Sequence, residues 1–70
     1  MKAEEIRALS TEEIYVRIDE AREELMNLRF QQATGELLDA TRLSYSRHLI
    51  ARCLTILRER EITAAREGVA

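Results

Sequence analysis

The stretch ELMNLRFQQATGELLDATRLSYSRHLIAR, residues 24–52, decides the fold of this chain. Both of its ends carry spaced apolar side chains among helix-forming residues, whereas its middle, from Ala33 to Leu37, contains Gly35. Glycine commonly ends a helix because it adopts the left-handed backbone conformation without a steric penalty. The stretch therefore predicts two helices separated by a short break.

The first helix is predicted over about residues 10–33. Ser10 is a suitable N-cap, and Glu13 three positions later completes a capping box. The apolar residues that follow recur at spacings of 4, 3, 4 and 3 and are Ile14, Ile18, Ala21, Leu25 and Leu28. This spacing places them on one stripe of the helix, which is expected to be buried.

The second helix is predicted over about residues 40–65, after a break at about 34–39, with Asp39 as its N-cap. Its stripe, with spacings of 3, 4, 3 and 4, consists of Leu43, Ser46, Ile50, Cys53 and Leu57. Two long helices joined by a short connection pack antiparallel with their stripes facing each other.

We therefore expect an all-α fold, an antiparallel two-helix hairpin with long coiled-coil-like helices. A short helical turn within residues 2–9 precedes it, and a frayed helical continuation over residues 62–70 follows. Seventy residues make one small domain, predicted over 1–70.

The second helix has a wider apolar face than a two-helix seam needs. Tyr45, Leu49, Arg52 and Ile56 fall on a second line, and Leu54 widens the other flank. Two explanations are open: the N-terminal segment covers this face through Ile6 and Leu9, or the face docks another macromolecule. On the second explanation the partner-docking residues are Tyr45, Leu49, Leu54 and Ile56.

Composition excludes several classes of function. One cysteine forms no intramolecular disulfide, and no Cys/His cluster predicts a metal site, so we expect no metal and no cofactor. The N-terminus has no apolar segment typical of a secretory signal, and no apolar run reaches the ~20 residues of a membrane span. The expected protein is soluble and cytoplasmic, with no membrane partner.

The charges are segregated along the chain although the net charge is only −2. Residues 1–38 carry five basic and nine acidic groups, whereas residues 41–60 carry five arginines against Glu59 alone. Ten of the eleven basic residues are arginine, whose planar guanidinium suits phosphate oxygens. The pattern indicates a polyanion contact on the second helix, with a solvated arginine face as the simpler alternative.

No residue is predicted to be catalytic. The acidic side chains of the first helix are Asp19, Glu20, Glu23 and Glu24, and such exposed carboxylates are normally solvated. His48 has no nearby partner in the sequence, and Cys53 is expected to be a buried apolar residue. Phe30 lies opposite the apolar stripe, where it either folds onto the connection or meets a partner.

The joint pattern of the chain resembles one protein family over roughly residues 1–60. The residues that carry the resemblance are Leu25, Asn27, Leu28, Arg29, Phe30, Gln31, Ala33, Thr34, Gly35 and Leu37, then Arg42, Leu43, Arg47, Ile50, Ala51, Arg52, Thr55 and Leu57. With the opening Met1, Lys2, Ala3, they are similar to bacterial large-subunit ribosomal protein twenty-nine. The chain departs from the family pattern at His48, Leu49 and Leu54 and in being acidic overall.

The resemblance implies a non-enzymatic structural protein of the large ribosomal subunit that contributes to translation. It implies binding to large-subunit ribosomal RNA beside the exit of the nascent-chain tunnel, next to ribosomal protein twenty-three, in a region that receives chaperone and targeting factors. No small-molecule substrate is implied. The residues expected to contact phosphates are Lys2, Arg7, Arg29, Arg42, Arg47 and Arg52.

Two other classes of function fit parts of the pattern. A generic antiparallel coiled-coil interaction module without an RNA role would share the acidic character and the wide apolar face. A small helical chorismate mutase would share the arginine-bearing helices, but Lys2 is the only lysine, so the mid-chain lysine of those enzymes has no counterpart.

Overall fold

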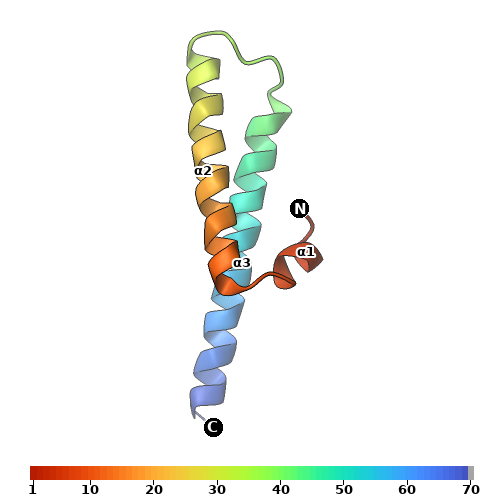
Figure 1. Cartoon of the computed structure of the whole chain (residues 1–70), viewed down its shortest axis with the longest axis vertical. Coiled ribbons are helices and arrows are strands. Elements are labelled where there is room, and N and C mark those ends of the chain that lie inside the picture. Colours follow the sequence, from red (N-terminus) through yellow and green to blue (C-terminus); the bar gives the residue numbers. More distant parts are fainter. Residues whose placement is uncertain (70) are drawn as a thin grey trace.

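The structure, a computed structural model, describes residues 1–69 as three helices. They are α1 (Ala3–Arg7), α2 (Thr11–Ala33) and α3 (Thr41–Val69). α2 and α3 lie side by side in opposite directions, and the short α1 lies against α3 (Figure 1). No strand occurs in this described part of the chain, and the predicted all-α hairpin with a short N-terminal helical turn is confirmed.

α3 includes the helical continuation that the sequence predicts beyond residue 65. It continues past residue 65 to Val69, and residues 61–68 are all exposed. Figure 1 shows this end of α3 projecting beyond the start of α2. Ala70, the last residue of the predicted domain and of its helical continuation, lies outside the described residues.

The start of α2 forms one of the two hydrogen bonds of the predicted capping box. Ser10 is the N-cap, and its Oγ accepts a hydrogen bond from the backbone N–H of Glu13 at 3.2 Å. This bond satisfies one of the N–H groups that have no partner inside a helix. Glu12 and Glu13 occupy the first turn, where negative charge complements the helix dipole.

Gly35 ends α2 as predicted, in a left-handed conformation with φ of 78°. Its N–H donates to the carbonyl of Gln32 at 3.2 Å, and the N–H of Glu36 donates to the carbonyl of Gln31 at 2.7 Å. These two bonds form a Schellman motif, which satisfies carbonyls in the last turn of the helix. Thr34 adds hydroxyl bonds to the carbonyls of Phe30 and Gln31, each at 3.2 Å.

α3 begins at Thr41, one residue later than predicted, so Asp39 lies two residues before the first residue of the helix. It still caps the helix. Asp39 Oδ1 accepts from the Thr41 N–H at 3.0 Å and from the Thr41 hydroxyl at 2.6 Å. The hydroxyl bond, and then the backbone bond, lower the pKa of the Asp39 carboxyl, with a smaller contribution from the charge of Arg42.

The stripe of α2 is buried except at one position. Ile14, Ile18, Ala21 and Leu28 are buried, whereas Leu25 is only half-buried. The prediction of a fully buried Leu25 is therefore wrong. Leu28, which is nearer the connection, is 1 % exposed, so Leu25 lies at the edge of the seam between α2 and α3 whereas Leu28 lies within it.

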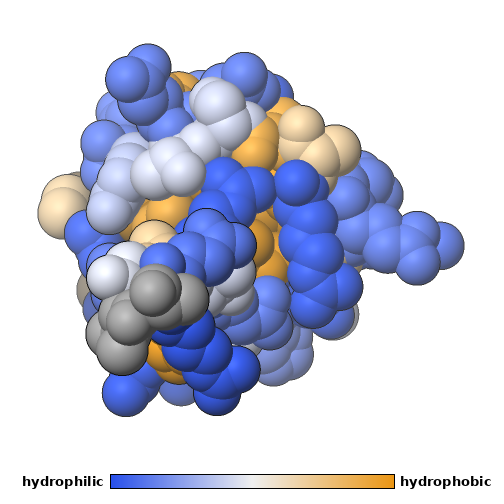
Figure 2. All heavy atoms as spheres, turned by 90° about the horizontal axis from the view of Figure 1, so that it is seen from below, coloured by the Kyte–Doolittle hydropathy of each residue, from blue (hydrophilic) through white to orange (hydrophobic). Residues whose placement is uncertain are grey.

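The hydrophobic core cluster lies where α1, α2 and α3 meet. Its buried residues are Ile6, Ile14, Ile18, Cys53, Ile56 and Leu57. The described chain is a rod of 54 × 18 × 15 Å with a radius of gyration of 15.1 Å, against ~11 Å for a compact domain of this length. Seen along the rod from the α3 end, hydrophilic side chains cover most of the surface and hydrophobic ones show between them (Figure 2). A rod this thin has room for only a narrow core.

Candidate nucleic-acid interface

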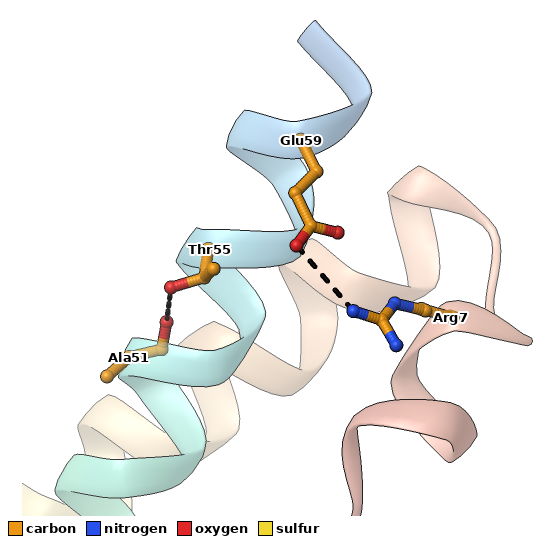
Figure 3. A network of polar contacts seen from close by, with 4 residues as sticks. All are labelled: Arg7, Ala51, Thr55 and Glu59. Atoms are coloured by element: carbon orange, nitrogen blue, oxygen red, sulfur yellow. Dashed lines mark hydrogen bonds and ion pairs between the residues drawn. The ribbon is translucent and has the colours of Figure 1, made fainter. Parts of the chain in front are cut away.

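The N-terminal arm, residues 1–9, covers the second apolar line of α3. The N-terminal ammonium of Met1 donates to the Tyr45 hydroxyl at 2.8 Å, and Arg52 Nη1 donates to the Met1 carbonyl at 3.0 Å. At the other end of the arm, Arg7 pairs with Glu59 at 3.6 Å (Figure 3). The arm therefore runs in the same direction as α3, and the explanation in which the N-terminal segment covers this face applies.

This arrangement changes the reading of the predicted docking residues. Ile56 is 3 % exposed and belongs to the core with Ile6, so its burial does not agree with a role in docking a partner. Leu49 is half-buried and packs against the same core. Tyr45, at 56 % exposed, and Leu54, at 44 %, keep much of their surface accessible. The docking prediction stays open for these two residues.

Arg60 makes polar contacts that the sequence does not indicate. Its Nη2 donates to the carbonyls of Leu9 at 2.7 Å and Arg7 at 3.2 Å, and its Nη1 donates to the Thr11 hydroxyl at 3.1 Å. All three acceptors are distant in sequence, and two are backbone carbonyls, so no local motif could reveal them.

The six predicted phosphate-binding residues fall into two groups. Arg7, Arg42 and Arg52 already have partners in the chain, namely Glu59, Glu24 and the Met1 carbonyl. Within residues 1–69 the side chains of Lys2, Arg29 and Arg47 form no ion pair or hydrogen bond, and all three are exposed. The cations of the second group can bind an external anion without giving up an internal contact.

Arg47 borders a shallow hollow of about 290 Å³ on α3, lined also by Ser44, His48 and Ala51. A second hollow, of about 190 Å³, lies between the arm and α3 and shares Ala51; Arg7, Arg52, Thr55 and Glu59 are among its other residues. Thr55 donates to the Ala51 carbonyl at 2.8 Å, as Figure 3 shows, which keeps its hydroxyl within the helix. The small side chain of Ala51 thus separates two cationic parts of one face.

A larger groove of about 560 Å³ lies between α2 and α3. Its lining combines the basic Arg17 and Arg42 with the acidic Glu20 and Glu24. Arg17 pairs with Glu20 at 3.1 Å, and Arg42 pairs with Glu24. Because the charges of this groove neutralise each other, it is a poorer site for a polyanion than the face around Arg47.

The remaining candidate residues lie apart from this face or inside the core. Phe30 is 68 % exposed and does not fold onto the connection, and Asp19, Glu20 and Glu23 are exposed on α2. Cys53 is buried, and burial raises the pKa of its thiol.

In the described residues, no group of three or more His, Cys, Asp or Glu side chains could hold a metal ion. None of the helices described has the length and apolar character to cross a bilayer.

Comparison with known proteins identifies the family. The family model described as Ribosomal L29 protein matches residues 4–60, most of the chain. The chain belongs to the ribosomal L29 protein family. This confirms the resemblance seen in the sequence, and the family is one of structural ribosomal proteins rather than of enzymes.

Individual relatives match over nearly their whole length. The protein named large ribosomal subunit protein uL29 from Lactobacillus delbrueckii subsp. bulgaricus is 55 % identical over 62 residues, which cover 89 % of this chain and 95 % of the relative. Its namesake from a Geobacillus species is 56 % identical over 64 residues, 91 % of this chain and 94 % of the relative. A third, from Symbiobacterium thermophilum, is 49 % identical over 67 residues, 96 % of each chain.

The family match ends at Arg60, which is also the last residue of α3 that bonds to the arm. Residues 61–68 extend beyond both the match and the packed part of the rod. The family match thus covers most of α1, all of α2 and the part of α3 that packs against them.

Proposed function

We propose that this protein is a structural constituent of the large ribosomal subunit that binds large-subunit ribosomal RNA beside the exit of the nascent-chain tunnel. Its neighbour there is ribosomal protein twenty-three, and it works in the cytoplasm as part of the ribosome. The observation that carries the proposal is the near full-length similarity to proteins named large ribosomal subunit protein uL29. Chaperone and targeting factors at that site are further proposed partners.

The cationic face of α3 supports the RNA-binding part of this proposal. Residues 41–60 carry five arginines and one acidic side chain, and Arg47 is exposed and unpaired within the described chain. We assign phosphate contacts first to Lys2, Arg29 and Arg47. Arg7, Arg42 and Arg52 contribute only where an RNA phosphate replaces or joins their internal partners. Such contacts position the protein without reading sequence.

Charge-removing variants test this assignment. The double variant Arg29→Ala/Arg47→Ala should bind large-subunit ribosomal RNA more weakly than the original chain. It should also reduce the slope of log affinity against log salt by about 0.7–0.9 for each lost phosphate contact. Filter binding over a salt series measures both quantities, and far-UV circular dichroism should show unchanged helicity because both side chains are exposed.

Arg22→Ala is the matched control. It removes one arginine from an exposed position on α2 that is not among the proposed contacts. Equal weakening by Arg22→Ala would show only a general charge effect. Co-sedimentation with large subunits after a high-salt wash tests the ribosomal role itself, and absence of the chain from the subunit peak would favour a coiled-coil interaction module instead.

A further inference from the structure

Arg60 joins three elements at one point. Its guanidinium donates to the carbonyls of Arg7 and Leu9 at the end of α1 and to the hydroxyl of Thr11 at the start of α2. The last carbonyls of a helix have no partner inside that helix, and a positive charge near them interacts favourably with the helix dipole. α1 has only five residues, far too few for a helix to be stable alone. Arg60 therefore adds from α3 a partner for the Arg7 carbonyl, beside the bonds that the N–H groups of Ala8 and Leu9 make to the last turn of α1.

Arg52 holds the opposite end of the arm. Its Nη1 donates to the Met1 carbonyl at 3.0 Å, and the Met1 ammonium donates to Tyr45 at 2.8 Å. Between these two polar attachments Ile6 is fully buried at 0 % exposed. The arm is thus held at both ends by hydrogen bonds with α3 and in the middle by apolar burial.

The position of the arm decides where two cations lie. Lys2 directly follows the carbonyl that Arg52 binds, and Arg7 carries one of the carbonyls that Arg60 binds. The hollow beside Arg7 and Arg52 meets the hollow beside Arg47 at Ala51. A closed arm therefore keeps Lys2 and Arg7 beside the cationic face of α3, with Arg7 paired to Glu59 until a phosphate replaces or joins that partner, and a detached arm would carry both cations away from it.

We propose that Arg52 and Arg60 are positioning residues, which hold the arm on α3 so that Lys2 and Arg7 join Arg47 in one phosphate-binding face. The inference rests on the proposed RNA-binding function. It assigns Arg52 a role different from the direct phosphate contact that the family resemblance implies. The guanidinium of Arg60 is directed at three oxygens of the protein itself, which leaves it poorly placed for an external phosphate.

Charge-conserving variants separate positioning from direct contact. Lysine keeps the positive charge and serves as a point contact to phosphate, but it cannot reproduce a planar fork that donates to three oxygens. Arg60→Lys should accelerate hydrogen exchange of the amides in residues 3–9 by about tenfold, the effect of losing one hydrogen bond to a charged group. Exchange in the middle of α2 should not change. Arg52→Lys should give a smaller acceleration at the same amides, because Arg52 donates a single bond.

The control is Arg58→Lys, an exposed arginine of α3 outside the proposed contacts. It should leave exchange in residues 3–9 unchanged. Uniform acceleration throughout the chain by Arg60→Lys, with no preference for the arm, would show a general stabilising role and overturn the proposal. Unchanged exchange in the arm for both Arg60→Lys and Arg52→Lys would overturn it as well.

A double-mutant cycle with RNA completes the test. Arg60→Lys should weaken binding to large-subunit ribosomal RNA no more than Lys2→Ala/Arg7→Ala does, and it should cause no further loss when combined with that variant. A full additional loss in the combination would mean that Arg60 contacts RNA itself. If the original chain binds no RNA, the proposed function fails and the role of the arm in binding fails with it, whereas the exchange data still decide whether Arg52 and Arg60 hold the arm.

Discussion

The two ends of the hairpin differ in how many elements meet there. At the arm end α1 closes over α2 and α3, and Ile6, Ile14 and Ile56 are almost completely buried. At the connection end only two helices face each other; Leu28 is buried there at 1 % exposed, but Leu25 and Leu43 are half-buried and Leu38 is fully exposed. A two-helix seam leaves apolar surface at its edges, and a third element is needed to enclose it. Stability should therefore be concentrated at the arm end.

The largest effect should come from removing a core side chain at the arm end. Ile14→Ala should lower the free energy of unfolding by about 2–5 kcal/mol, because a fully buried side chain leaves a cavity. Leu25→Ala, at the connection end, should cost less than about 2 kcal/mol, because a half-buried side chain loses only part of its transfer free energy. Urea unfolding followed by circular dichroism measures both.

Val16→Ala provides a control on α2. Val16 is exposed, so this variant should change the free energy of unfolding only by the difference in helix propensity between the two residues. Equal losses for Ile14→Ala and Leu25→Ala would contradict the difference between the two ends. They would indicate instead that the seam is uniform along its length.

The connection end has its own sensitive position at Gly35. Gly35→Ala should destabilise the chain by about 1–2 kcal/mol, because an L side chain rarely adopts its positive φ. The open space around the position rules out a steric clash as the cause. Thermal unfolding measures the loss. Gly68→Ala, in the helical end of α3 with equally open space, is the matched control and should be neutral or slightly stabilising.

The smallest effect should be the contribution of Asp39 to the pH dependence of the free energy of unfolding. The hydrogen bonds from Thr41 lower the pKa of this carboxyl in the folded chain. The stabilisation is therefore complete above the unfolded-state pKa of about 4 and disappears as pH falls through the lower folded value. NMR titration of the side-chain carboxyl carbon should give a midpoint below the usual one for aspartate.

Thr41→Val removes the hydroxyl that makes the shorter of the two bonds to Asp39. It should move the Asp39 midpoint back towards its ordinary value. An unchanged midpoint in this variant would mean that the hydroxyl bond is not the main cause of the shift.

Local signals allowed much of the hairpin to be predicted. Ser10 with Glu13 identified the start of α2, Gly35 its end, and the 3–4 spacing of Ile14, Ile18 and Leu28 the buried stripe. These features depend on residues within one or two helical turns of each other, which a single sequence displays directly. The helical continuation beyond residue 65 was predicted as well, although residues 61–68 are exposed and follow no apolar period.

The candidate site was predictable in type but not in detail. Charge segregation indicated a cationic face on the second helix, and Arg47 lies there without an internal partner in the described structure. The contacts of Arg52 and Arg60 were not predictable. Apart from the Thr11 hydroxyl, their acceptors are the backbone carbonyls of Met1, Arg7 and Leu9, and a backbone carbonyl is present at every residue of any sequence. A backbone acceptor does not depend on the residue type, so the order of side chains along the chain does not indicate it.

The sequence by itself determined two amphipathic helices, the turn between them, the segregation of charge and membership of the ribosomal L29 protein family. Only the tertiary structure decided what covers the second apolar line of α3. Apolar periodicity shows that a helix face needs a cover, but burial is non-directional and does not specify which segment supplies it. Arg52 and Arg60 reach carbonyls of the arm across about 50 positions of the chain, and such contacts exist only after the helices have packed.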